Sequence, residues 1–200
     1  MKKVILSMQM SLDGFIEGPA GEMDWIVYDD EEQWANLFSI LESVDLIVVG
    51  AGMYPGYVNH WRSVLSNPDA PSNQVKYSRL AENIQHIVFS KTLDRIDPMA
   101  PKGYDGGWKK NTSIMKGEVK EEMLKLKQQS GKNILLFGGA SLAKSFINLG
   151  LIDEYRLVMN QLILGKGKRF FYNINQRHGL KLITGTIFKS GATMLYYRAI

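Results

Sequence analysis

The sequence predicts an α/β fold in which helices cover both faces of a mixed, mostly parallel sheet. Two observations support this prediction. Up to about residue 150, short apolar runs typical of buried strands alternate with segments of helical periodicity, which is the pattern of parallel sheets. After residue 154 the chain contains strand-like segments with no long helix between them, so the last part of the sheet is expected to be antiparallel.

Three strands and two helices are expected in the first half of the chain. Leu46–Val49 is a wholly apolar run that ends at Gly50, which is the pattern of a strand covered on both faces. Glu31–Leu41 places its apolar residues three and four positions apart, which favours one buried helix face. The other elements expected here are strands Val4–Met8 and His86–Ser90, helix Tyr77–Ile84, and loops Leu12–Glu22 and Asp94–Trp108.

The second half is expected to add two helices and five strands. Ile134–Phe137 is fully apolar, and Gly138-Gly139 leads from it into a helix over Ser141–Leu149, which Gly150 ends as a left-handed cap. The other elements are helix Val119–Leu126 and strands Thr112–Met115, Tyr155–Leu164, Leu180–Lys189 and Thr193–Arg198, the last two joined by a Ser190-Gly191 turn. No internal repeat or linker interrupts the chain, so a single domain over residues 1–200 is expected.

The composition excludes several functional classes. Hydrophobic residues make up 45% of the chain and charged residues 22%, as in packed globular proteins. The chain has no cysteine, and His60, His86 and His178 lie in no metal-binding spacing, so neither a disulfide nor a metal site is expected. The net charge of +4 comes mostly from scattered basic residues, which favours an anionic small ligand over nucleic acid.

The N-terminal apolar run from Val4 to Leu12 is expected to be a buried strand rather than a signal peptide. Gln9 interrupts the run, and Asp13-Gly14 follows where a cleavage site would lie. No apolar run reaches the roughly 18 residues that a membrane span requires. A cytoplasmic protein with no membrane partner is therefore expected.

The strongest local motif is the buried strand that runs through Gly138 and Gly139 into a helix. This arrangement places backbone N–H groups and the positive end of the helix dipole at the carboxyl edge of the sheet. Because the two glycines lack side chains, a pyrophosphate group can approach the backbone closely. The alternative is a tight strand-to-helix turn that binds no ligand.

Two other strand ends are candidate phosphate contacts. Gly50-Ala51-Gly52 begins like a dinucleotide-binding fingerprint but does not continue as one, so it is better interpreted as a second strand end at the same crevice. Ser90 and Lys91 place a hydroxyl and a cation after the third strand, where they either bind a phosphate or form a surface pair without a ligand.

Four consecutive acids, from Asp29 to Glu32, lie at the start of the first expected helix. Carboxylates at this position interact favourably with the helix dipole, which gives them a structural explanation. The alternative is that one of them faces a pocket.

Several segments together resemble one family, the stand-alone proteins similar to the reductase domain of riboflavin-pathway deaminase–reductases. These reductases belong to the dihydrofolate reductase-like superfamily, and the resemblance spans nearly the whole chain. The segments that carry it are Ser11–Trp25, Phe89–Leu93, Ile134–Leu142, Leu149–Glu154 and Leu164–Phe170.

The resemblance implies a three-layer, dihydrofolate reductase-like fold with a sheet of about eight strands and a C-terminal antiparallel hairpin. It also implies a homodimer and an NADPH cleft across the ends of the parallel strands. The residues expected to contact NADPH are Gln9, Ile16, Gly50, Gly52, Ser90, Lys91, Gly138, Gly139, Ala140, Ser141 and Leu142.

The implied chemistry is hydride transfer from NADPH to a small heterocyclic or carbonyl substrate, for which 5-amino-6-ribosylaminouracil phosphate is one candidate. Asp13 and Asp30 are the candidate catalytic acids, and Trp25 and Asp29 the candidate substrate contacts. Asp30 lies five residues after Trp25, a spacing similar to that of the folate-binding acid of dihydrofolate reductases.

One departure from the family pattern bears on function. Relatives usually have Gly-Arg-x-Thr where this chain has Gly50-Ala51-Gly52-Met53, so a cation and a hydroxyl that would contact phosphate are replaced. A nucleotide-binding protein without catalysis is therefore an alternative to the reductase, and a dihydrofolate reductase is a third possibility.

Overall fold

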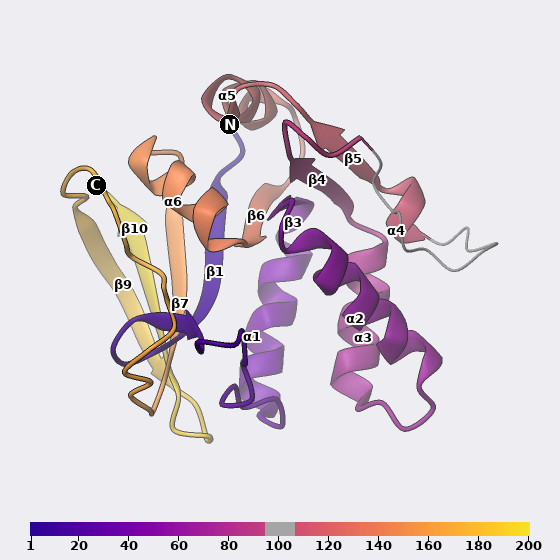
Figure 1. The fold of residues 1–200 in the computed structure, drawn as a ribbon, viewed down its shortest axis with the longest axis vertical. Coiled ribbons are helices and arrows are strands. Elements are labelled where there is room, and N and C mark those ends of the chain that lie inside the picture. The colour runs from indigo at the N-terminus through magenta and orange to yellow at the C-terminus, as the bar shows by residue number, and fades with distance from the viewer. Residues whose placement is uncertain (95–106) are drawn as a thin grey trace.

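The computed structural model describes residues 1–94 and 107–200. Its centre is one eight-stranded sheet, whose strands are β1 (Val4–Ser11), β3 (Val44–Gly50), β4 (Gln85–Phe89), β5 (Thr112–Met115), β6 (Asn133–Gly138), β7 (Glu154–Asn160), β9 (Leu180–Ile187) and β10 (Thr193–Ala199). They lie in the order β5-β4-β3-β6-β1-β7-β10-β9 (Figure 1). The first six strands of this order run parallel, and β10 is antiparallel to both of its neighbours. The expected mixed sheet with a C-terminal antiparallel pair is confirmed.

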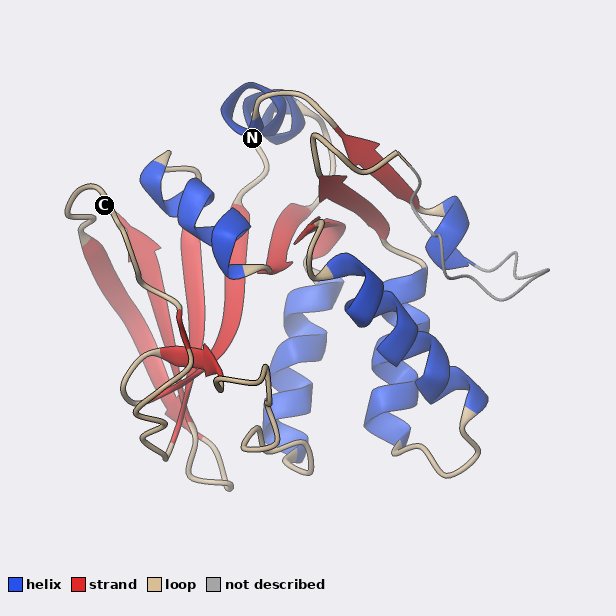
Figure 2. Cartoon of the chain, in the orientation of Figure 1, coloured by secondary structure: helices blue, strands red, loops and turns tan. Residues whose placement is uncertain are grey.

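Helices cover both faces of the sheet, which confirms the three-layer prediction (Figure 2). The helices are α1 (Glu31–Glu42), α2 (Tyr54–Ser66), α3 (Ser72–Glu82), α4 (Gly107–Lys110), α5 (Val119–Gln128) and α6 (Ala140–Asn148). Alternate residues of one strand pack against opposite layers, as in any pleated strand. Ile47 of β3 belongs to the apolar cluster with α1, α2 and α3, whereas its neighbour Val48 belongs to the cluster with α5 and α6.

The structure differs from the sequence prediction in several elements. Helix α2 was not expected at all, and α3 begins at Ser72 rather than at Tyr77. The strand expected over Tyr155–Leu164 ends at Asn160 as β7. The chain after it instead contributes β8 (Lys168–Arg169), which pairs antiparallel with the short strand β2 (Phe15–Glu17) outside the main sheet.

The loop expected over Asp94–Trp108 lies mostly outside the described residues. Its last residue, Trp108, belongs to α4 and is fully buried among the aromatic side chains of α2 and α3. Over the two described ranges, no helix has the length and apolar character needed to cross a bilayer.

Candidate active site

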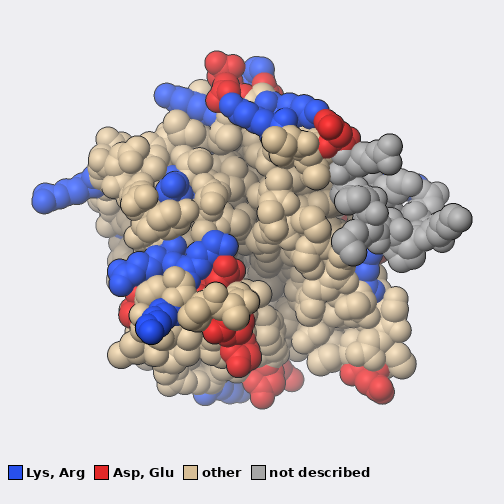
Figure 3. All heavy atoms as spheres, in the orientation of Figure 1, with Lys and Arg blue, Asp and Glu red and all other residues tan. Residues whose placement is uncertain are grey.

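A cavity of about 930 Å³ opens at the carboxyl ends of the central parallel strands. Gly50 of β3, Phe89 of β4 and Gly138 of β6 line it, and it continues between α1 and the sheet face formed by β1 and β7. Figure 3 shows a hollow at the centre of this face of the molecule, with uncharged walls and charged side chains gathered mainly on its rim. Parallel α/β sheets commonly bind ligands in such a crevice.

The ends of β3 and β6 meet at the glycine pair that the sequence singled out. Gly139 has φ +91°, in the region that favours glycine, and a Cβ built on it would lie 3.3 Å from the Cα of Gly50. The two strand ends therefore leave no room for a side chain between them. This close approach exposes backbone on the cavity wall, as close contact with a pyrophosphate requires.

Two helices begin at this wall without a side chain that caps their N–H groups. Gly139 is the N-cap of α6 and Met53 is the N-cap of α2, and both residues line the cavity. In contrast, the N-terminus of α1 is capped by the side chain of Asp30. Unsatisfied N–H groups and the positive ends of two helix dipoles thus face one cavity, which favours a ligand with more than one phosphate.

The far end of the cavity contains the second expected phosphate contact. Ser90 and Lys91 line the wall immediately after β4. The Ser90 Oγ accepts a hydrogen bond from the backbone N–H of Leu93 at 2.9 Å, and the Lys91 ammonium lies 2.6 Å from the carboxylate of Glu118. Both charged side chains are more than two-thirds exposed, so Lys91 can exchange Glu118 for a phosphate at small cost.

At the other side of the cavity, β1 contributes Gln9, and Ile16 of β2 lies beside it. The side-chain oxygen of Gln9 accepts a hydrogen bond from the Asn160 amide at 3.0 Å. The NH₂ group of Gln9 therefore remains as a neutral donor for a bound ligand. All the residues expected to contact NADPH line this one cavity: Gln9, Ile16, Gly50, Gly52, Ser90, Lys91, Gly138, Gly139, Ala140, Ser141 and Leu142.

Asp30, a candidate catalytic acid, is not among the residues that line the cavity, and its carboxylate is engaged in hydrogen bonds. It accepts hydrogen bonds from the backbone N–H groups of Glu32, Gln33 and Ser190. Burial raises the pKa of Asp30, but these bonds outweigh that effect and hold the pKa below its usual value. Asp30 is thus an ionised helix cap that also ties α1 to the turn after β9.

Asp13 is likewise placed away from the cavity. Its carboxylate accepts hydrogen bonds from the hydroxyl of Ser11 and from the backbone N–H groups of Leu164 and Gly165. Desolvation raises the pKa of Asp13, but the hydrogen bonds from Ser11, Gly165 and Leu164 together outweigh this effect, so that the net pKa is lowered. The carboxylate at this position joins the end of β1 to the loop after β7.

The two expected substrate contacts, Trp25 and Asp29, are also outside the cavity wall. Their neighbours in the same segment line it instead, namely Met23, Ile26, Val27 and Tyr28. The sequence indicated a segment that reaches the cavity but not which of its side chains line it, because the turns between β2 and α1 follow no simple periodicity.

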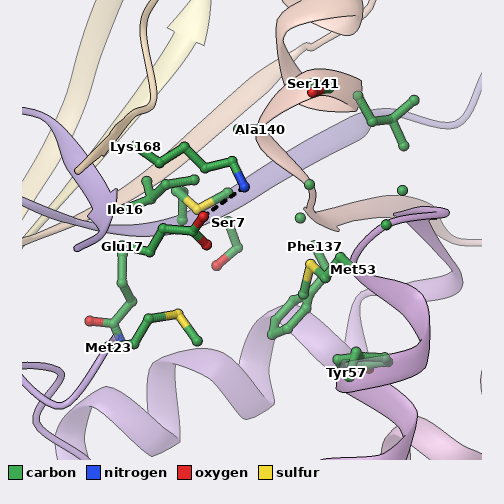
Figure 4. A pocket seen from close by; sticks show the side chains of 18 of the residues that line it. Ser7, Ile16, Glu17, Met23, Met53, Tyr57, Phe137, Ala140, Ser141 and Lys168 are labelled. Carbon is green, nitrogen blue, oxygen red and sulfur yellow. Dashed lines mark hydrogen bonds and ion pairs between the residues drawn. The ribbon is translucent and has the colours of Figure 1, made fainter. Parts of the chain in front are cut away.

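Sequence reasoning missed the part of the wall that α2 supplies. Tyr57, His60 and Trp61 of this helix line the cavity, and partial desolvation lowers the pKa of His60 from its usual value. The other addition is the pair formed by Glu17 and Lys168, whose charged groups lie 2.7 Å apart across β2 and β8 at the cavity (Figure 4). The spacing of apolar residues on α2 was the available signal for the first group.

The family model of the RibD C-terminal domain matches residues 2–196 of this chain. The chain belongs to the RibD C-terminal domain family. Among curated proteins, the uncharacterized protein YyaP of Bacillus subtilis is 33% identical over 196 residues, which cover 98% of this chain and 94% of YyaP.

Solved structures of a putative riboflavin biosynthesis protein, of a deaminase/reductase and of a dihydrofolate reductase share this fold. A putative riboflavin biosynthesis protein from Shewanella sp. PV-4 matches with a TM-score of 0.71 and 22% identity over 100% of this chain and 99% of its own. The diaminohydroxyphosphoribosylaminopyrimidine deaminase/5-amino-6-(5-phosphoribosylamino)uracil reductase of Thermotoga maritima matches with a TM-score of 0.65 and 15% identity. The match covers 100% of this chain and 57% of the Thermotoga chain. The dihydrofolate reductase of Enterococcus faecalis, complexed with NADP(H), matches with a TM-score of 0.60 and 15% identity. The match covers 98% of this chain and 96% of the reductase chain. The dihydrofolate reductase-like fold is therefore confirmed.

Proposed function

We propose that this chain is an NADPH-dependent reductase of the riboflavin-pathway reductase type, acting on a small heterocyclic or carbonyl substrate. The observation that carries the proposal is the pair of uncapped helix N-termini at Gly139 and Met53, which meet at a side-chain-free strand end. NADPH presents a pyrophosphate and a 2′-phosphate, and the wall offers backbone donors for the first and Lys91 for the second. Family membership supports the oxidoreductase class.

When bound, NADPH supplies a hydride, and the protein's own groups orient the reacting partners. The backbone from Gly138 to Leu142 would hold the pyrophosphate, and Ser90 with Lys91 the adenosine end. Gln9, fixed by Asn160, would direct its NH₂ group to a carbonyl oxygen in the cavity. Among the described lining residues, Glu17 is the single carboxylate, and it is paired with Lys168. Proton delivery is therefore assigned to solvent.

A nucleotide-binding protein without catalysis is the second candidate, and one observation favours it. The thioether of Met53 lies directly over Gly138, in the space that a Cβ on that glycine would occupy. The family pattern has a threonine here, so the cradle of this chain is narrower and lacks a hydroxyl. A narrower cradle would weaken NADPH binding or hold the nucleotide without turnover.

The test measures binding and turnover separately. NADPH is titrated into the purified protein by calorimetry, and the melting temperature is recorded with and without the nucleotide. Saturable binding with a raised melting temperature, together with NADPH oxidation in a screen of heterocycles and carbonyl compounds, is the expected result. Binding without oxidation of NADPH by any compound favours the second candidate, and absence of binding refutes both.

We expect little or no reduction of dihydrofolate. Protonation of a pteridine requires an acid beside the substrate, and the face of α1 that lines the cavity carries Gln33, Asn36 and Leu37. Asp30, whose spacing from Trp25 resembles that of the folate-binding acid, caps α1 by accepting backbone N–H groups. Turnover of dihydrofolate at about 1–1000 per second, the range of ordinary enzymes, would contradict this expectation.

We also propose a homodimer that uses the edge strand β9. This strand exposes unpaired backbone groups and three large apolar side chains, with exposed fractions of 52% for Leu182, 40% for Ile183 and 77% for Ile187. Such an edge favours association unless another chain covers it. Light scattering is expected to give the mass of two chains at micromolar concentration.

The matched variants are Ile187→Lys and Leu124→Lys, which place the same charge on β9 and on the exposed side of α5. The first should shift the protein to the mass of one chain, and the second should leave the mass unchanged. A single-chain mass for the unmodified protein would rule out the dimer.

A further inference from the structure

The sheet face formed by β1 and β7 is one wall of the cavity, and we call it the floor. Ser7 and Gln9 of β1 and Val158 of β7 line it, because alternate residues of a strand lie on the same face. Figure 4 shows Ser7 beside the open cavity, below the Glu17–Lys168 pair. Gln9 is the one amide among the three floor residues, so the end of this amide that faces the cavity decides which ligand groups can form a hydrogen bond with it.

The side-chain oxygen of Gln9 is already engaged by a neighbouring strand. It accepts a hydrogen bond from the side-chain NH₂ group of Asn160, at the end of β7, over 3.0 Å. The NH₂ group of Gln9 has no acceptor among the described residues, and its nitrogen is not sealed from solvent. Because Gln9 lines the cavity, this NH₂ group is open to a ligand there.

A backbone carbonyl holds the Asn160 amide in this orientation. Asn160 is 2% exposed, and its NH₂ group also donates to the carbonyl oxygen of Met10 at 3.4 Å. Its Oδ1 is buried and has no partner in the described part of the chain. If the amide were turned over, Oδ1 would face the carbonyl oxygen of Met10, and the NH₂ group would be buried with no acceptor. The hydrogen-bond partners of an amide decide its orientation, and they favour the one observed.

We propose that Asn160 is a positioning residue that makes Gln9 a hydrogen-bond donor toward the cavity, so that the floor selects ligands by a carbonyl oxygen. A ligand N–H group at this place would face the N–H groups of Gln9 and leave both donors unpaired, which is costly in a partly buried site. Two ligands of the proposed reaction carry a carbonyl oxygen, namely the nicotinamide carboxamide of NADPH and a carbonyl substrate. The choice between these two rests on the proposed function, whereas the polarity of Gln9 does not.

The test uses two neutral bicyclic probes of similar size. 1-Indanone has a carbonyl acceptor and no donor, and indole has an N–H donor and no carbonyl. Their dissociation constants are measured on the nucleotide-free protein by NMR titration, from the backbone amide resonances of β1. The quantity compared between variants is the Kd of indole divided by the Kd of 1-indanone, so that the different apolarity of the two probes cancels.

Asn160→Asp should lower this ratio at least about tenfold. The new carboxyl group accepts the NH₂ group of Gln9, whose oxygen then faces the cavity and favours indole. Gln9→Met removes the donor without presenting an acceptor, and should lower the ratio about three- to tenfold. A merely structural defect would weaken the binding of both probes and leave their ratio unchanged.

Asn67→Asp is the matched control. It makes the same substitution at an exposed residue after α2, where the side-chain oxygen that accepts the N–H of Asp69 is kept. The ratio should stay at its unmodified value. An unchanged ratio in a folded Asn160→Asp protein, or an equal fall in Asn67→Asp, overturns the role of Asn160, and an unchanged ratio in Gln9→Met overturns the role of Gln9.

Hydrogen exchange in the unmodified protein tests the orientation without a substitution at the buried Asn160. The side-chain N–H protons of Gln9 should exchange with solvent as fast as those of an exposed amide, and those of Asn160 should be protected. Protected Gln9 protons would mean that Gln9 donates to Asn160, and would overturn the proposal even if Asn160→Asp failed to fold.

Repeating the titrations in saturating NADP⁺ distinguishes the two sources of the carbonyl oxygen. If the ratio persists, Gln9 binds the carbonyl of the substrate. If 1-indanone no longer binds and Gln9→Met weakens NADP⁺ binding, Gln9 binds the nicotinamide carboxamide. Absence of NADP⁺ binding would count against the proposed function alone, because the ratio in the nucleotide-free protein still decides the polarity of Gln9.

Discussion

Gly139→Val is expected to abolish NADPH binding, with a loss of affinity of roughly a hundredfold or more, about 2.7 kcal/mol. Even the first carbon of the new side chain would lie 3.3 Å from the Cα and 3.4 Å from the N of Gly50. The ends of β3 and β6 must move apart, and the N–H groups at the start of α6 then lose their arrangement around the pyrophosphate. Calorimetric titration with NADPH measures the effect.

Gly150→Val is the matched control at the other end of α6. Gly150 has φ +63°, and a Cβ built on it meets no atom within 4 Å. Both variants place a β-branched residue at positive φ, which costs about 1–2 kcal/mol of stability. The control should therefore melt at a lower temperature yet bind NADPH normally. NADPH affinity that is equal in a folded Gly139→Val protein and in the control would refute the placement of the pyrophosphate.

Lys91→Ala is expected to weaken NADPH binding by about 10- to 150-fold and to leave NADH binding nearly unchanged. The 2′-phosphate distinguishes the two nucleotides, and it carries nearly two negative charges that need a cation. Ala51 stands where relatives usually have an arginine, so Lys91 is the cation on a matching strand end. Parallel titrations with NADPH and NADH give the ratio.

The ion pair of Lys91 provides an opposite test. Glu118 lies 2.6 Å from the Lys91 ammonium and competes with the phosphate for it. Glu118→Gln removes that competition and should strengthen NADPH binding a few-fold, with NADH unaffected. If Lys91→Ala weakened the binding of NADPH and NADH equally, Lys91 would contact the pyrophosphate that both nucleotides share.

Much of the fold was predictable because its strands have strong local signals. The wholly apolar runs Leu46–Val49 and Ile134–Phe137 are buried on both faces, and no other element type of that length fits them. Helix α2 escaped prediction because Pro55 and Gly56 near its start are typical of loops. Proline is nevertheless well tolerated in a first helical turn, and the buried residues Tyr57, Val58 and Trp61 follow helical spacing.

The parts of the site that are formed by the backbone could be predicted from the sequence. The parts that depend on contacts between side chains of distant segments could not. Gly138 and Gly139 are recognisable because a ligand-binding turn needs residues without side chains. Asp30 was a candidate catalytic acid because the sequence shows a carboxylate at the start of a helix. It does not show which backbone N–H groups donate hydrogen bonds to that carboxylate. The pair of Glu17 and Lys168 became visible only when β2 and β8 were placed side by side, and no sequence pattern marks such a contact.

The position of β1 has a consequence for how the chain is made. This strand is first in the chain but lies inside the sheet, where Val4 pairs with Ile134 and Ile5 with Glu154. Ribosomes build chains from the N-terminus, so the apolar segment from Val4 to Met10 must wait for partners that are synthesised about 130 and 150 residues later. Closing such long loops slows folding. We therefore expect the nascent chain to depend on chaperones that shield this segment, and nucleotide binding to begin only after β7 has left the ribosome.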